Sequence, residues 1–126
     1  MFEGMQIFRM SHGLAAHAGA RQIAASANVA QADTPGYRAR GVEEFARTWA
    51  RADAGAMRAT RPEHFASAAP GAPRTIIETV SGEPGGNGVS LEREMTRAAL
   101  ARQDHDMALG VYRSALGVLR TSLGRR

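Results

Sequence analysis

The chain has 126 residues and a net charge of +4, and it contains neither cysteine nor lysine. These absences exclude disulfide bonds, cysteine-ligated zinc, the phosphate-binding lysine of a P-loop and Schiff-base chemistry. Alanine is abundant, with 25 copies, whereas only seven residues are aromatic. Because alanine favours helix but buries little apolar surface, we expect helices that pack closely against partners, including other copies of the chain.

Residues 5–32 have the pattern of an α-helix and make up most of the first of three predicted segments, 1–33. Large apolar side chains share one face at the start, and smaller ones follow the same spacing on a shifted face further along. Such a helix lets neighbours approach closely on more than one side. The two sets are Ile7, Met10 and Leu14, followed by Ala16, Ala20, Ile23, Ala27 and Ala30.

The run Asp33-Thr34-Pro35-Gly36-Tyr37 ends this helix abruptly. Pro35 lacks an N–H group and disfavours helical geometry at the residue before it. The Pro-Gly pair suits the two central positions of a type II turn. Asn28, one turn before the helix end, can hydrogen-bond backbone or a neighbour, and Tyr37 leaves the turn close to the helix. The residues predict a stiff elbow that carries an aromatic side chain, although an ordinary helix-to-loop turn fits them as well.

Residues 34–88 form the second segment and hold all five prolines and eight of the fourteen glycines. We expect mostly irregular chain here. The stretch EEFARTWARADAGAMRA predicts a short helix with Phe45, Trp49 and Ala52 on one side. The stretch TIIETV predicts one short strand.

Residues 89–126 form the third segment and show the strongest periodicity. A helix over 91–123 would be about 50 Å long at 1.5 Å per residue. Ser90 suits the N-cap of this helix, and Glu92 and Glu94 suit its first turn, where the helix dipole favours negative charge.

Ten positions of this helix follow a four-three alternation, and eight of them are apolar, which defines a heptad seam. The seam needs a facing helix, because isolated helices are marginal in water. We expect residues 5–32 to fold back antiparallel onto it, so the predicted fold is mainly α, an antiparallel coiled coil with a short irregular or weakly β middle segment. Apolar surface left over serves neighbouring copies, and we expect marginal order in the dilute monomer and full order on assembly. The seam positions are Leu91, Met95, Ala98, Arg102, His105, Leu109, Tyr112, Leu116, Leu119 and Leu123.

The titratable residues form no catalytic or metal-binding arrangement. His12 and His17 are five residues apart and do not share a helix face. His105 lies between two aspartates, but consecutive helix residues do not converge on one ion. We therefore expect no enzymatic activity, no metal and no cofactor, and we interpret Arg102 as an ion-pair or register element of the seam.

The basic residues are spread along the chain, which favours a solvated surface of mixed charge. The alternative is a small arginine-rich module that binds nucleic acid or an acidic partner, and it requires a one-sided arginine stripe. The start MFEGMQIFRM lacks the pattern of a secretory signal peptide, and no apolar run reaches the roughly 18–20 residues of a membrane span. The C-terminal arginines that do not form one clean stripe are Arg93, Arg97, Arg113 and Arg120.

The run NVAQADTPGY, from Asn28 to Tyr37, closely resembles the N-terminal signature of the bacterial flagellar axial proteins, the family of rod, hook and hook-associated subunits. That signature often reads Asn-Ile-Ala-Asn-Ala and then Asp-Thr-Pro-Gly-Tyr. The present chain departs from it at Val29 and Gln31.

The C-terminal run GNGVSLEREM and the later Leu-Arg-Thr look like the closing helix of the proximal rod type, FlgB. The chain departs from that type at Ser90, Ala101 and His105. The resemblance covers residues 5–45 and 85–124. The short middle segment favours the proximal rod type over distal rod and hook proteins, which carry larger insertions.

The resemblance implies a structural subunit that is made in the cytoplasm and exported unfolded by the flagellar type III apparatus without a cleaved signal peptide. It implies helical assembly into the basal-body rod, which crosses the periplasm and transmits motor torque, with the terminal helices in an inner coiled-coil layer. The implied partners are other copies, other rod subunits, the adaptor protein FliE and the export gate, without nucleic acid and without a membrane span. The residues expected to serve assembly and packing are Asn28, Asp33, Thr34, Pro35, Gly36 and Tyr37 at the elbow, and Leu91, Met95, Leu109, Tyr112, Leu116, Leu119 and Leu123 on the seam.

Overall fold

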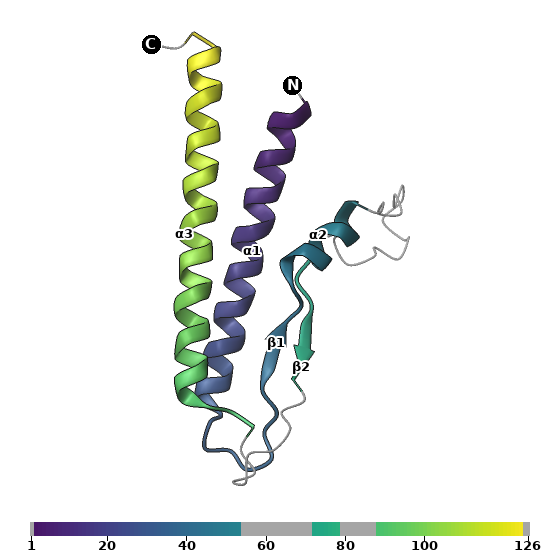
Figure 1. Ribbon diagram of the computed structural model, residues 1–126, viewed down its shortest axis with the longest axis vertical. Coiled ribbons are helices and arrows are strands. Elements are labelled where there is room, and N and C mark those ends of the chain that lie inside the picture. Colours follow the sequence, from purple (N-terminus) through teal and green to yellow (C-terminus); the bar gives the residue numbers. More distant parts are fainter. Residues whose placement is uncertain (1, 54–71, 79–87, 125–126) are drawn as a thin grey trace, which may run out of the picture.

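The computed structural model describes residues 2–53, 72–78 and 88–124. Two long helices, α1 (Phe2–Ala30) and α3 (Leu91–Ser122), lie side by side and run in opposite directions (Figure 1). The described part of the chain is mainly helical, and its terminal helices pair antiparallel, as the periodicity predicted. No helix in these ranges combines the length and apolar character needed to cross a membrane.

A smaller unit, which we call the arm, lies along another side of α1 (Figure 1). It consists of strand β1 (Arg40–Val42), helix α2 (Phe45–Asp53) and strand β2 (Thr75–Ile77). The two strands pair antiparallel, with Gly41 opposite Ile76. The sequence predicted β2 but not β1, because the three residues of β1 are too few to carry a recognisable alternation.

Three contacts along the α1–α3 pair set its antiparallel alignment. They lie at three successive levels of the two helices, so the pairing extends over most of α1. From the N-terminal end of α1 they are the edge-to-face rings of Phe8 and Tyr112 with centroids 5.2 Å apart, the ion pair of Arg21 with Asp104, and the hydrogen bond from Asn28 Nδ2 to Glu94 Oε2 at 2.9 Å.

Small side chains fill the contact between the two long helices. Ala18 and Ala25 of α1 and Ala101 and Ala108 of α3 are all buried. Within each helix the two alanines are seven residues apart, which places them on one line along the helix. Because alanine projects only a methyl group, the two backbones approach closely, and the interface buries little apolar side-chain surface.

The face of α3 that meets α1 coincides with the predicted seam only in part, since Tyr112 of the seam contacts Phe8 of α1. The buried positions of α3 are Glu94, Ala101 and Ala108, which lie beside the seam. Two lines of alanine fit closely, whereas leucines and methionines would hold the helices apart, and Glu94 finds its hydrogen-bond partner on α1. Among the seam residues Leu109 and Leu116 are half-buried, and the exposed ones are Leu91, Met95, Tyr112, Leu119 and Leu123.

The arm packs on α1 through a second set of small residues. The α-carbon of Gly13 faces Phe45 and Trp49, and a methyl group there would lie 3.6 and 3.7 Å from their rings. Ala52 lines the same groove, so the predicted apolar side of α2 faces α1. The small residues of α1 therefore accept neighbours on more than one side, as their distribution predicted.

The elbow has the predicted turn. Helix α1 ends at Ala30, and the backbone N–H of Tyr37 donates to the carbonyl oxygen of Thr34 at 3.2 Å. Gly36 has a φ of 75°, the left-handed value that a type II turn requires at its third residue. The chain then leaves the turn along α1 and enters β1.

The ends of α3 agree with the sequence in part. Ser90 occupies the N-cap with extended backbone, but its hydroxyl makes no capping hydrogen bond. The helix ends one residue before the predicted Leu123, and Gly124 follows with a φ of 66°. The predictions for residues 54–59 and 79–87 and for the last two arginines lie outside the described residues.

We predict that Ala101→Leu lowers the stability of the helix pair by about 1–3 kcal/mol, because the larger side chain overpacks the alanine contact. Ala99→Leu is the matched control, since Ala99 is exposed on the same helix. Thermal unfolding followed by circular dichroism at 222 nm measures both variants. Equal melting temperatures for the two would contradict the close alanine interface.

Candidate functional site

The side chain of Asn28 joins the three parts of the molecule at the elbow. It is completely buried. Its Nδ2 group donates to the carbonyl oxygen of Arg40 at 2.8 Å and to Glu94 Oε2 at 2.9 Å. Its Oδ1 atom accepts from the backbone N–H of Arg40 at 2.8 Å and from the hydroxyl of Tyr37 at 3.2 Å. An asparagine amide has two donors and two acceptor sites, so its hydrogen-bonding capacity is fully used.

Glu94 continues this network from α3 towards the arm. Its side chain is 2 % exposed, and it receives a hydrogen bond from Arg97 Nη1 at 2.9 Å as well as the one from Asn28. Arg97 also reaches Glu78, beyond the end of β2, at 2.8 Å. The network thus connects α1 and α3 with Arg40 at the start of β1 and with Glu78 just after β2. A buried carboxylate persists only when its charge is compensated, and here an amide and a guanidinium supply that compensation.

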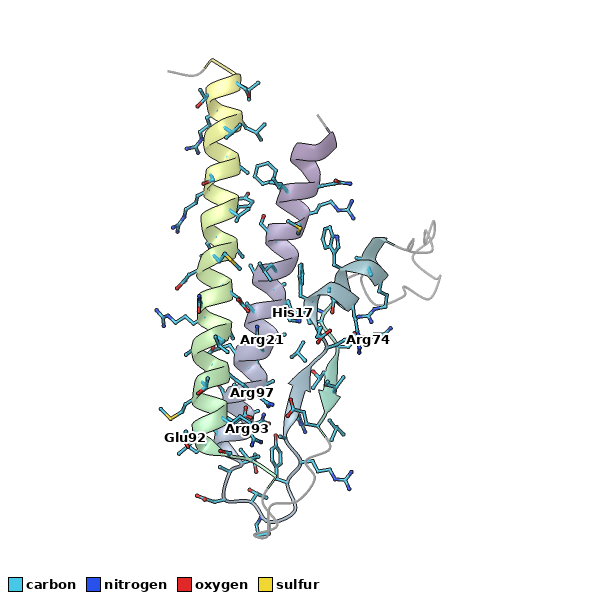
Figure 2. The ribbon with its side chains drawn as sticks, viewed as in Figure 1. His17, Arg21, Arg74, Glu92, Arg93 and Arg97 are labelled. Carbon is cyan, nitrogen blue, oxygen red and sulfur yellow. The ribbon has the colours of Figure 1, made fainter. Side chains whose placement is uncertain are left out.

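The pKa of Arg97 reflects this position. Partial burial acts to lower it, but the hydrogen bond and charge of Glu78 and the charge and hydrogen bond of Glu94 outweigh burial and raise the pKa. Figure 2 shows Arg97 and Arg21 on the stretch where α1 and α3 lie together beside strands β1 and β2. Arg21 is paired with Asp104 on this stretch. The two arginines therefore fasten α3 to its neighbours by charge as well as by packing.

The predicted elbow residues divide into two groups. Asn28 is buried and Tyr37 half-buried, and the two touch through their polar groups. The turn itself is exposed, and within it Thr34 donates to Gln31 Oε1 at 2.7 Å. Asn28 thus bonds both backbone and neighbouring side chains, as its place one turn before the helix end suggested. The exposed turn residues are Asp33, Thr34, Pro35 and Gly36.

A second attachment holds the base of α2. His17 of α1 is buried, its Nε2 donates to the carbonyl oxygen of Glu43 at 2.6 Å, and its ring packs edge-on against Phe45. The carboxylate of Glu43 accepts a hydrogen bond from Arg51 Nη1 at 2.7 Å. That hydrogen bond has the largest effect and lowers the pKa of Glu43. Burial acts in the opposite direction, and the charges of Arg51 and of two further arginines add to the lowering.

The predicted seam residues form a largely uncovered apolar surface on α3. Beside them, a groove of about 590 Å³ runs between α1 and α3, with Ala18, Gly19 and Ala101 among its lining residues and Ile23 at its edge. Ile23 is 73 % exposed, an unusual state for so large an apolar side chain. Arg102 and His105 also line the groove, and Arg102 has no ion-pair partner in the described ranges. The role of Arg102 as an ion-pair or register element of the seam therefore stays a prediction.

The titratable side chains of the described residues do not gather in the way that a metal site requires. No group of three histidine, aspartate or glutamate side chains there is placed to hold an ion. His105 approaches Asp106 only at 3.9 Å, and Asp104 turns to Arg21 instead. The buried polar groups of the elbow satisfy one another and fix its geometry. At the base of α2, by contrast, Arg51 Nη2 is buried without a hydrogen-bond partner among the described residues.

Sequence reasoning missed the buried role of Glu94 and its link through Arg97 to Glu78. The sequence placed Glu94 in the first turn of the helix, where acidic residues are favoured, and the structure agrees, but its place in that turn did not predict its burial. A signal was present, since Glu94 precedes Ala101 and Ala108 at intervals of seven. The alanine line was overlooked because the leucine seam has the larger apolar side chains.

The chain matches no model of a known protein family, and no curated protein is significantly similar to it in sequence.

We predict that Asn28→Ala destabilises the protein by at least about 2 kcal/mol, because Oε2 of the buried Glu94 and the backbone N–H of Arg40 lose their hydrogen-bond partner. Ser26→Ala is the matched control, since Ser26 is exposed on the same helix. Urea unfolding monitored by circular dichroism gives both free energies. If the two variants were equally stable, the Asn28 network would not be needed for the fold.

We further predict that acid loosens the base of α2, where Glu43 pairs with Arg51. Because the pKa of Glu43 in the folded protein lies below its ordinary value of 4.5, its contact with Arg51 stabilises the fold above that pH. The stabilisation is lost as the pH falls through the lowered pKa. Trp49, the single tryptophan, reports the change by its fluorescence. Glu43→Gln should remove this transition, and an unchanged titration in that variant would contradict the assignment.

Proposed function

We propose that this protein is a structural subunit of the bacterial flagellar basal-body rod, of the proximal rod type, and that it works through helix packing without chemistry. The observation that carries the proposal is the Asn28 network. The NVAQADTPGY run resembles the axial-protein signature, and in this chain its asparagine and tyrosine fix the angle between α1 and the arm. A signature whose residues set the geometry of a subunit suits an assembly protein.

The distribution of apolar side chains supports the same proposal. The fully buried hydrophobic residues of the described ranges are almost all alanines, whereas leucines, isoleucines and methionines are exposed on α1 and α3. A protein that buries its small residues and exposes its large ones has a surface typical of a protein interface. Self-assembly would cover that surface and add the burial that the alanine contact lacks.

The arginines do not favour the alternative of nucleic-acid binding. Arg21, Arg51 and Arg97 each have a carboxylate partner. Arginines that are neutralised within the chain contribute little to a phosphate-binding surface. The other arginines of the described residues are divided between both long helices and the arm with its flanking residues.

The proposal extends to partners and place. As the resemblance implies, the subunit would be exported through the flagellar type III apparatus and would contact its own copies, other rod subunits, the adaptor protein FliE and the export gate. The elbow would aim the arm outward from an inner layer of helices, and a stiff turn suits a subunit under torsional load.

We predict that deleting the gene abolishes swimming and removes rods from isolated basal bodies, and that the intact gene restores both. Leu119→Asp should fail to restore them, because it places a charge on the exposed seam. Ser114→Asp, at an exposed position on the side of the same helix opposite the seam, should restore them. Complete rods in the deletion strain, or full function of Leu119→Asp, would contradict the proposal.

A further inference from the structure

A groove of about 480 Å³ lies between the N-terminal half of α1 and the arm. Its lining includes the rings of Phe8, Phe45 and Trp49. Arg9 and His12 also line it, both are exposed, and neither has a hydrogen-bond or ion-pair partner in the described residues. The groove therefore presents aromatic surface together with an uncompensated positive charge.

The first turn of α3 presents the complementary features. Leu91 and Met95 are 52 and 63 % exposed, and their spacing of four places them side by side on the helix. Glu92 lies between them in sequence, and its carboxylate has no partner in the part of the chain that the structure describes. Figure 2 shows Glu92 at the end of α3 that lies farthest from the N-terminus of α1. Arg93 does not share the face of Leu91, because residues two apart on a helix point in different directions.

We propose that the aromatic groove of one copy receives the Leu91–Met95 turn of a second copy, so that subunits join head to tail. This inference rests on the proposed function as an assembling subunit. The leucine and methionine enter the groove, where a thioether packs favourably against aromatic rings. Glu92 then pairs with Arg9, with His12 nearby. Charge decides which end of α3 fits, because its other exposed apolar end carries Arg120 instead of an acid.

The contact has to form between copies. Arg9 lies at the level of Tyr112, because its neighbour Phe8 touches that ring, whereas Glu92 lies near the level of Asn28. About twenty residues of helix separate these levels, or roughly 30 Å at 1.5 Å per residue. Since the two surfaces differ, the contact is heterologous and propagates from copy to copy instead of closing a two-fold dimer.

Charge reversal tests this contact with the purified full-length chain, and sedimentation velocity measures association over a range of concentrations at low salt. We expect Arg9→Glu and Glu92→Arg each to weaken association at least about tenfold, because each places like charges at the contact. An equimolar mixture of the two variants should restore it, since each groove then meets a turn of opposite charge. The double variant should restore it as well. Arg113→Glu, an exposed control with the same change in net charge as Arg9→Glu, should associate like the wild type.

The outcomes separate this inference from the proposed function. If both single variants associate normally while Leu119→Asp does not, the head-to-tail contact is wrong and assembly through the helix faces stands. If the single variants fail and the mixture does not recover, the pairing of Arg9 with Glu92 is wrong. A wild-type chain that stays monomeric at every concentration overturns the contact together with self-assembly. Circular dichroism of each variant confirms that the exposed substitutions leave the helices intact.

Discussion

The rest of the structure depends on one buried amide. Asn28 uses both donors and both acceptor sites to join the end of α1 to the elbow, the first strand and α3. It is the point at which the two long helices and the arm meet. Burying the carboxylate of Glu94 would by itself destabilise the fold, and Asn28 and Arg97 offset this cost by binding it. Pro35 and Gly36 set the turn, and the network fixes the direction in which the chain continues.

The alanine contact between α1 and α3 has a consequence for the surface. Helices that meet through Ala18, Ala25, Ala101 and Ala108 come close, but they leave the large apolar side chains of α3 on the outside. A folded monomer of this kind gains little from burial relative to the conformational entropy that its helices lose. Association of several chains, as proposed above, would supply the missing burial and would account for the exposure of most large apolar residues of the seam.

Much of this fold follows from local patterns. Helix periodicity, proline and glycine chemistry and the small residues of α1 predicted the two long helices, their antiparallel pairing, the type II turn and the short α2. The buried positions of α3 did not follow, because periodicity ranks faces by apolar bulk and the intramolecular contact selected small size. The elbow residues of the candidate site were predicted, but Glu94 and its link to Glu78 depend on contacts between residues far apart in sequence, which no local pattern encodes.

The central claim is that the helices of this chain become fully ordered by assembling. The most direct measurement is the helical content and melting temperature of the wild-type chain by circular dichroism, from micromolar to millimolar concentration. Because assembly binds only the folded state, the account predicts that both rise with concentration. A fully helical chain whose melting temperature is independent of concentration would contradict it.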